Sequence, residues 1–140
     1  MYRCGIDIVR IARIERLGQE AGFRERIFSA AELAAAEKRG FRAEFFAGRW
    51  AAKEAVAKAL GCGFGKDCSP AEIEILPDGR GAPQVRLSGA AAATAREEGI
   101  LSWSVSISHE RDYATALAVA ETGKIARSDR AMRDKGGEKI

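Results

Sequence analysis

The sequence lacks any long hydrophobic run. No apolar stretch reaches the ~18 residues that a membrane-spanning helix needs, and the first residues lack the pattern of a secretory signal peptide. We therefore expect a cytoplasmic protein without a membrane partner. A chain of 140 residues suffices for one domain with a single modest core.

Cysteine and histidine are scarce. The three cysteines are an odd number, and Cys62 and Cys68 lack the CxxC spacing of a zinc site. We interpret them as reduced thiols that pack as small hydrophobic side chains. His109 is the only histidine. A lone histidine is more often structural than functional, so by itself it favours a structural role.

Most of the chain also lacks an excess of either positive or negative charge. The formal net charge is +3, and residues 124–140 account for all of it with six basic and three acidic side chains. Residues 1–123 are therefore neutral, which argues against nucleic acid as the main partner, because such a protein needs a basic face on its folded part. We expect a domain over residues 1–123 and a charged, mobile tail over residues 124–140.

The most informative stretch that is present is FFAGRWAAKEAVAKALG, Phe45–Gly61, which is rich in strong helix formers. Glu54 and Lys58 lie four residues apart and share one face of the predicted helix. Ala47 and Ala51 lie near the same face, so we expect open space beside the two charges. The alternative is an ordinary ion pair on a solvated face, which contributes only about 0.3–0.5 kcal/mol.

A strand is predicted near the N-terminus, where YRCGIDIV alternates. Residues 4, 6 and 8 would lie on one face of this strand, and residues 5, 7 and 9 on the other. Asp is depleted in strands, so Asp7 needs an explanation. It either caps the following helix, which begins near Arg10, or binds a ligand. Asp7 lies slightly early for a cap.

Two further strands are predicted late in the chain. The stretch LSWSVSISHERDYATALAVAE predicts strands over Leu101–Ser108 and Tyr113–Glu121, joined by the polar turn His109–Asp112. His109 therefore lies where the first of these strands ends.

These three segments together resemble one family. GIDI, GRWAAKEAVAKALG and SISHERDYATALAV are similar, in order and separation, to the signature blocks of the holo-acyl-carrier-protein synthases, the short, single-module 4′-phosphopantetheinyl transferases. The resemblance covers about residues 5–121 and is weakest over residues 18–42 and 83–100. It implies an enzyme that moves the phosphopantetheine arm of coenzyme A onto a serine of apo acyl carrier protein, releasing 3′,5′-ADP and supporting fatty acid biosynthesis.

The resemblance also implies site residues. The family's metal-binding Asp and Glu fall on Asp7 and Glu54, its lysine on the same helix falls on Lys58, and its histidine falls on His109. Mg²⁺, with Mn²⁺ as an alternative, would bind the two carboxylates and the diphosphate of coenzyme A, since Mg²⁺ typically takes one or two carboxylates plus substrate phosphates. The metal and Lys58 would neutralise charge on the phosphates.

The sequence leaves the general base open. The candidates are Glu54, a metal-bound water held by Asp7, and His109, and we favour the carboxylate or the water. We assign His109, Arg49 and Lys66 to contacts with the nucleotide. Lys66 lies in GCGFGKD, which looks like a phosphate loop, but these glycines follow a helix, so a helix C-cap and loop is the better interpretation.

A basic stripe is predicted on the first helix. Arg10, Arg13 and Arg16 recur every three residues beside a predicted buried stripe that includes Ile11 and Ile14. The alternative is a solvated face whose arginine stems cover the edge of the core. In the resembling family this helix binds the acidic carrier protein, and one of its arginines aligns with Arg13. Complementary charge would then steer the encounter.

Helices and a hairpin are predicted between the signature blocks: Ala30–Arg39, Ala43–Leu60, the hairpin Ala71–Leu76 with Gln84–Leu87, and Ser88–Glu98. Ser29 is a candidate N-cap, with Glu32 at the capping-box position. The predicted fold class is α+β, in which strands from both ends and the middle of the chain form one antiparallel sheet against helices.

A chain of this size has little depth for a coenzyme A pocket. The resembling family forms trimers with each site at a subunit junction, so we expect a homotrimer whose nucleotide lies between Asp7, Glu54 and Lys58 of one chain and residues of the neighbour. Two other classes are considered. One is a non-catalytic carrier-binding module, which the intact set of charged residues argues against. The other is a nucleic-acid binder that uses the basic residues among 127–139.

Overall fold

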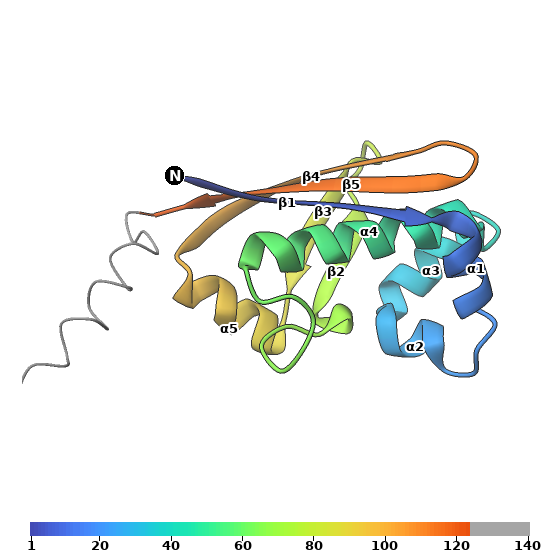
Figure 1. Ribbon diagram of the computed structural model, residues 1–140, viewed down its shortest axis with the longest axis horizontal. Coiled ribbons are helices and arrows are strands. Elements are labelled where there is room, and N and C mark those ends of the chain that lie inside the picture. Colours follow the sequence, from blue (N-terminus) through green and yellow to red (C-terminus); the bar gives the residue numbers. More distant parts are fainter. Residues whose placement is uncertain (124–140) are drawn as a thin grey trace, which may run out of the picture.

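One long helix lies across one face of a three-stranded sheet, and shorter elements pack around it (Figure 1). The computed structural model describes residues 1–123, so the predicted tail at residues 124–140 lies outside the described residues. The elements in chain order are β1 (Tyr2–Arg10), α1 (Ile11–Leu17), α2 (Phe23–Ile27), α3 (Ala30–Lys38), α4 (Ala43–Leu60), η1 (Pro70–Glu72), β2 (Ile73–Pro77), β3 (Pro83–Leu87), α5 (Gly89–Glu97), β4 (Ile100–His109) and β5 (Tyr113–Thr122). The α+β class is confirmed.

The three-stranded sheet joins the two ends of the domain. Its order is β1-β5-β4, and both pairings are antiparallel. The prediction of one sheet is wrong for the middle of the chain, because β2 and β3 form a separate two-stranded sheet. Ile73 and Ile75 of β2 are completely buried. The hairpin therefore joins the domain by burying apolar side chains and not by main-chain pairing with the larger sheet.

Small residues bring α4 and the sheet into close contact. Ala47, Ala51 and Ala55 are completely buried, and a Cβ on Gly5 of β1 would lie only 2.0 Å from the Ala55 carbonyl oxygen. Alanines of β5 at positions 114, 116, 118 and 120 are buried as well. The expectation of open space beside the helix alanines is therefore wrong, because the sheet itself fills that space.

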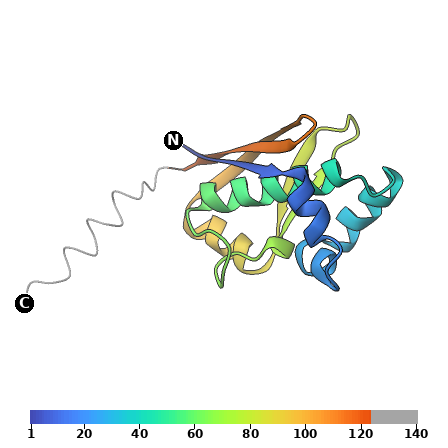
Figure 2. The ribbon, with the colours of Figure 1, turned by 45° about the vertical axis from the view of Figure 1, so that its right-hand side comes forward.

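The predicted helix ends are largely confirmed. Ser29 and Glu32 form the capping box of α3, with the Glu32 backbone N–H donating to Ser29 Oγ at 3.1 Å. The helix α4 ends at Leu60 and is capped by Gly61, whose φ of 83° lies in the left-handed region that favours glycine. The glycines after α4 thus begin a C-cap and loop, as interpreted. Figure 2 shows α1, α2 and α3 gathered at one end of the molecule.

The outer face of the larger sheet carries exposed apolar side chains on β1 and β5. Ile6 and Ile8 of β1 are each 65% exposed, and Leu117 of β5, which lies opposite Ile6, is 43% exposed. In Figure 1 the helices lie on the other side of this sheet. Within residues 1–123 no helix is both long and apolar enough to cross a membrane.

Candidate active site

Asp7 and Lys58 meet where β1 crosses α4. Asp7 lies on the same face of β1 as Gly5 and Val9, which pack on the helix. The Lys58 ammonium donates to Asp7 Oδ1 at 2.9 Å and to the Ile6 carbonyl oxygen at 2.9 Å. Lys58 thus pairs with another element and not within its own helix. Asp7 is not a helix cap, because α1 has Arg10 as N-cap without a side-chain cap bond.

Glu54 lies close to this pair. Burial raises the pKa of Glu54, and the negative charge of Asp7 raises it further, whereas Lys58 and Arg13 lower it. These electrostatic effects show that the structure brings together two predicted carboxylates, the predicted lysine and one arginine of the basic stripe. Two neighbouring carboxylates favour a cation between them, because a positive charge relieves their repulsion.

The donor set fits Mg²⁺ or Mn²⁺. Among residues 1–123, no group of three or more His, Cys, Asp and Glu side chains could hold a metal. Asp7 and Glu54 offer a pair of carboxylates, which is a smaller set of donors. Mg²⁺ commonly binds through one or two carboxylates and completes its shell with waters and substrate phosphates. The pair is therefore suited to a metal that arrives with a phosphate-bearing substrate.

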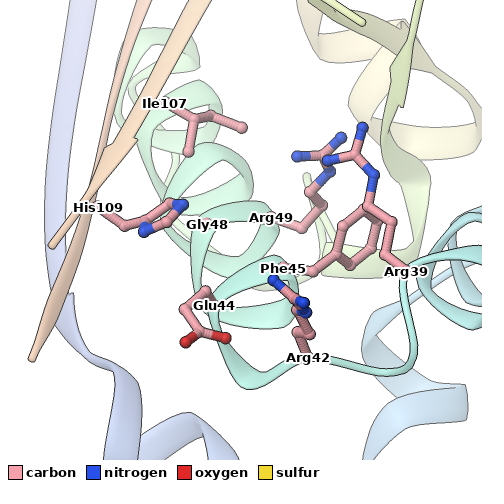
Figure 3. Close-up of a pocket in the computed structure, with 8 residues that line it drawn as sticks. All are labelled: Arg39, Arg42, Glu44, Phe45, Gly48, Arg49, Ile107 and His109. Carbon is pink, nitrogen blue, oxygen red and sulfur yellow. The ribbon is translucent and has the colours of Figure 1, made fainter. Parts of the chain in front are cut away.

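A second, basic cluster lines a pocket of about 160 Å³ beside the N-terminal half of α4 (Figure 3). Its basic residues are Arg39, Arg42, Arg49 and His109. One acidic residue, Glu44, also lines the pocket. His109 therefore lies at the end of β4, as predicted, and it shares the pocket with Arg49. An excess of positive charge in a small pocket suits an anion.

Two guanidinium groups in this pocket contact one aromatic ring. The Arg49 and Arg39 guanidinium carbons lie 4.3 Å and 5.6 Å from the centre of the Phe45 ring. Burial and the positive charge of Arg39 lower the pKa of Arg49 to about 10. The Arg49 Nε has no hydrogen-bond partner within the described part of the chain. An anion between these groups would offset their repulsion and accept from that nitrogen.

Sequence reasoning missed Arg39 and Arg42. They flank the turn between α3 and α4, which contains Gly40 with a φ of 70°. A basic turn directly before a helix N-terminus is the signal that could have found them, because helix N-termini favour anions.

The other predicted residues do not line the basic pocket, and of them Arg13 lies near the acidic cluster. Lys66 is exposed in the loop that follows the C-terminus of α4, whereas Arg49 lies in the N-terminal half of that helix. Arg10, Arg13 and Arg16 are all exposed, and Arg10 lies 5.2 Å from the centre of the Tyr113 ring. Ile11 and Ile14 are buried, which confirms the predicted apolar stripe of the first helix.

The acidic and basic clusters lie on opposite sides of α4. Asp7 belongs to β1 and His109 to β4, the two edge strands of the sheet, with β5 between them. On α4 itself, Arg49 and Lys58 are nine residues apart, which turns them to roughly opposite faces at ~100° per residue. A ligand that contacts both clusters of the same chain would therefore have to pass around α4.

Comparisons with known proteins agree on one family. Residues 3–118 match the family described as the 4′-phosphopantetheinyl transferase superfamily. A holo-[acyl-carrier-protein] synthase of Desulfovibrio desulfuricans is 44% identical over 84% of this chain and 94% of that protein. A protein of the same name from Sulfurovum is 45% identical over 85% of this chain and 96% of its own length.

Solved structures agree with the sequence relatives. The Helicobacter pylori holo-[acyl-carrier-protein] synthase, crystallised in complex with coenzyme A, is 36% identical with a TM-score of 0.75, over 84% of this chain and 99% of that chain. The synthase from Neisseria meningitidis is 37% identical with a TM-score of 0.78, over 86% and 98%. The resemblance of the three signature blocks is thereby confirmed: this chain belongs to the 4′-phosphopantetheinyl transferase superfamily.

Proposed function

We propose that this protein is a holo-acyl-carrier-protein synthase. It transfers the 4′-phosphopantetheine group of coenzyme A to a serine of apo acyl carrier protein, releases 3′,5′-ADP and supports fatty acid biosynthesis. The observation that carries this proposal is the meeting of Asp7, Glu54 and Lys58 at the contact of β1 and α4, in a chain closely related to synthases of that name. A solved relative that binds coenzyme A supports the choice of donor.

The acidic cluster supports the chemistry at the diphosphate. Asp7 and Glu54 would hold Mg²⁺ or Mn²⁺, which supplies positive charge to the diphosphate when bound. The Lys58 ammonium, whose side chain is 50% exposed, would contact a phosphate oxygen and stabilise the charge that develops on the leaving group. Asp7 orients this lysine through the 2.9 Å contact.

A proton must leave the attacking serine hydroxyl. Of the candidate bases, His109 lies with the basic cluster on the other side of α4. Glu54 lies beside Asp7 in the acidic cluster, where the serine hydroxyl and the diphosphate would meet. We therefore assign acceptance of the serine proton to a Glu54 carboxylate oxygen.

The basic cluster suits the second phosphate of coenzyme A. Coenzyme A carries a 3′-phosphate on its ribose in addition to its diphosphate. We assign the 3′-phosphate to the pocket of Arg39, Arg42, Arg49 and His109, because four basic side chains line it and the Arg49 Nε lacks a hydrogen-bond partner among residues 1–123. Lys66 stays a predicted nucleotide contact.

A complete site then requires two subunits. The acidic and basic clusters of one chain lie on opposite sides of α4, so one coenzyme A would bridge the acidic cluster of one chain and the basic cluster of its neighbour. The exposed apolar side chains Ile6, Ile8 and Leu117 supply a surface on which subunits can associate. These features support association of subunits, and we propose a homotrimer because the family that the sequence resembles forms trimers.

The basic stripe is assigned to the carrier protein. Arg10, Arg13 and Arg16 are exposed, and Arg13 is close enough to Glu54 to lower its pKa. A carrier protein that binds along α1 would therefore deliver its serine near Glu54. The three cysteines are free, which suits a reducing compartment and supports a cytoplasmic location.

The decisive experiment weighs the carrier protein. Apo acyl carrier protein is incubated with this protein, coenzyme A and Mg²⁺, and its mass is measured. We expect the mass of the carrier protein to rise by one phosphopantetheine group. In a sample with EDTA, the mass should not change. An unchanged carrier mass under saturating conditions would contradict the proposed activity and would favour the alternative of a non-catalytic carrier-binding module. Retention on DNA that is lost when residues 124–140 are removed would instead support the nucleic-acid binder.

A further inference from the structure

Four charged side chains face one another between α3 and α4, at two levels. Glu32 of α3 and Lys53 of α4 form the level farther from the connecting turn, and their oxygen and nitrogen lie 2.7 Å apart. Arg39 and Arg49 form the level nearer the turn, where both guanidinium groups contact Phe45. Lys53 follows Arg49 by four residues, so the two share one face of α4. One level therefore joins opposite charges, and the other places like charges side by side.

The Lys53 ammonium uses all its donors inside the protein. Its side chain is completely buried. It donates to Glu32 Oε1, to the Pro70 carbonyl oxygen at 2.9 Å and to the Ile73 carbonyl oxygen. An ammonium has three N–H bonds, and each has a partner here.

The Glu32 carboxylate is equally enclosed. Its Oε1 accepts from the Ser29 backbone N–H at 2.9 Å as well as from Lys53, and its Oε2 accepts from the Ile75 backbone N–H at 3.1 Å. The negative charge of Glu32 also raises the pKa of Arg49, so the two groups are within electrostatic range. Glu32 nevertheless makes its bonds without Arg49, whose Nε stays unpartnered in the described part of the protein.

We propose that Lys53 is a positioning residue for Arg49: by neutralising Glu32, Lys53 leaves the Arg49 guanidinium available to the phosphate ligand of the pocket. A buried carboxylate without a cation is strongly unfavourable. If Lys53 were absent, Glu32 would attract the nearest buried cation, and Arg49 lies one helical turn away on the same face. The inference rests on the proposed function, because it takes the 3′-phosphate of coenzyme A as the ligand.

The test compares two ligands that differ by one phosphate. Dissociation constants of coenzyme A and of dephospho-coenzyme A, which lacks the 3′-phosphate, are measured by calorimetry with Mg²⁺. The unaltered protein should bind coenzyme A roughly tenfold or more tightly, as expected for a charge-assisted contact. In Lys53→Met this preference should fall to about one, while the affinity for dephospho-coenzyme A stays nearly constant.

A second variant separates positioning from simple support of the fold. Lys53→Met combined with Glu32→Gln has no buried carboxylate to attract Arg49, so the preference for coenzyme A should return. If the Glu32–Lys53 pair only supported the fold, the preference for coenzyme A should not return, since the double variant has lost more native contacts. Preserved preference in Lys53→Met, or no recovery in the double variant, overturns the inference.

The controls keep the outcomes distinct. Ala91→Gly removes a methyl group from the buried face of α5, away from the α3–α4 contact, and should lower the melting temperature without altering the preference. Should Lys53→Met not fold, Lys53→Gln retains a donor and should show the same loss and recovery. If the unaltered protein binds both ligands equally, the pocket assignment itself fails. If the unaltered protein prefers coenzyme A to dephospho-coenzyme A and the lysine variants keep this preference, the pocket assignment stands and only the positioning role of Lys53 is wrong.

Discussion

The two sides of α4 carry opposite charge, and they differ in how many of their charged groups have a partner of opposite charge. On the β1 side, Asp7 and Glu54 supply negative charge, and Lys58 already bonds Asp7. On the β4 side, the guanidinium groups of Arg39 and Arg49 contact the Phe45 ring, and no group of the described residues accepts a hydrogen bond from the Arg49 Nε. One side is suited to a cation and the other to an anion. The proposed binding of a metal with the diphosphate on one side and of a separate phosphate on the other would use this difference.

The largest expected effect comes from the acidic side. Glu54→Gln should lower the transfer rate at least about a hundredfold, because a neutral amide removes a metal ligand and the assigned proton acceptor while keeping the shape and helix propensity of the side chain. The measurement is the rate of carrier mass gain at saturating Mg²⁺. Asp7→Asn should behave similarly, with partial recovery at high metal concentration. Near-normal activity of Glu54→Gln would mean that the acidic side is not the reaction centre.

The next effect tests whether the two sides belong to different subunits. Leu117→Glu places a charge at the centre of the exposed apolar face, so it should convert the assembly to monomers and abolish most of the activity. Sedimentation velocity and the mass assay check both outcomes. Gln84→Glu adds the same charge on the exposed side of β3 and should leave both unchanged. A fully active monomer would show that one chain suffices.

A smaller effect is expected on the basic side. Arg49→Met keeps the aliphatic bulk of the side chain but removes the charge, so it should raise the KM for coenzyme A roughly tenfold with little change in kcat. The KM for dephospho-coenzyme A should change little, and this second substrate serves as the internal control. An equal rise of both KM values would place the phosphate elsewhere.

A further effect concerns the approach of the carrier protein to the acidic side. Arg13→Glu should raise the KM for the carrier by more than it lowers the rate at saturation, because the added negative charge repels an acidic partner. The difference should shrink with salt, since the Debye length falls to about 3 Å at 1 M. Coenzyme A binding should hardly change. A loss of coenzyme A affinity with an unaltered carrier KM would assign this helix to the nucleotide.

The smallest effect is on stability without metal. Burial and Asp7 raise the pKa of Glu54 above its ordinary value of 4.5, so the folded state binds this proton more tightly than the unfolded state. The stability that Glu54 contributes is therefore present at low pH and lost as pH rises through the folded-state pKa. In EDTA at pH 7, Glu54→Gln should melt slightly higher than the unaltered protein, and the difference should vanish toward pH 4.5. A lower melting temperature at pH 7 would contradict the electrostatic account.

Local sequence determined much of this protein. Helix formers and the following Gly61 set the limits of α4, and the Ser29–Glu32 capping box set the start of α3, because such signals act within a few residues. The alternation of β1 placed Asp7 on the face opposite Ile6 and Ile8. The three signature blocks alone indicate Asp7, Glu54, Lys58 and His109 as site residues.

Only the tertiary structure decided which charges meet. Spacing along α4 suggested a Glu54–Lys58 pair, but the close approach of β1, which Gly5 permits, gives Lys58 the Asp7 carboxylate as its partner. Spacing also could not show that the α3–α4 turn brings Arg39 beside Arg49, or that Glu32 has a second role as the counter-ion of Lys53. Secondary structure follows from short-range backbone and side-chain preferences, whereas the pairing of charges depends on distances between elements that only packing fixes.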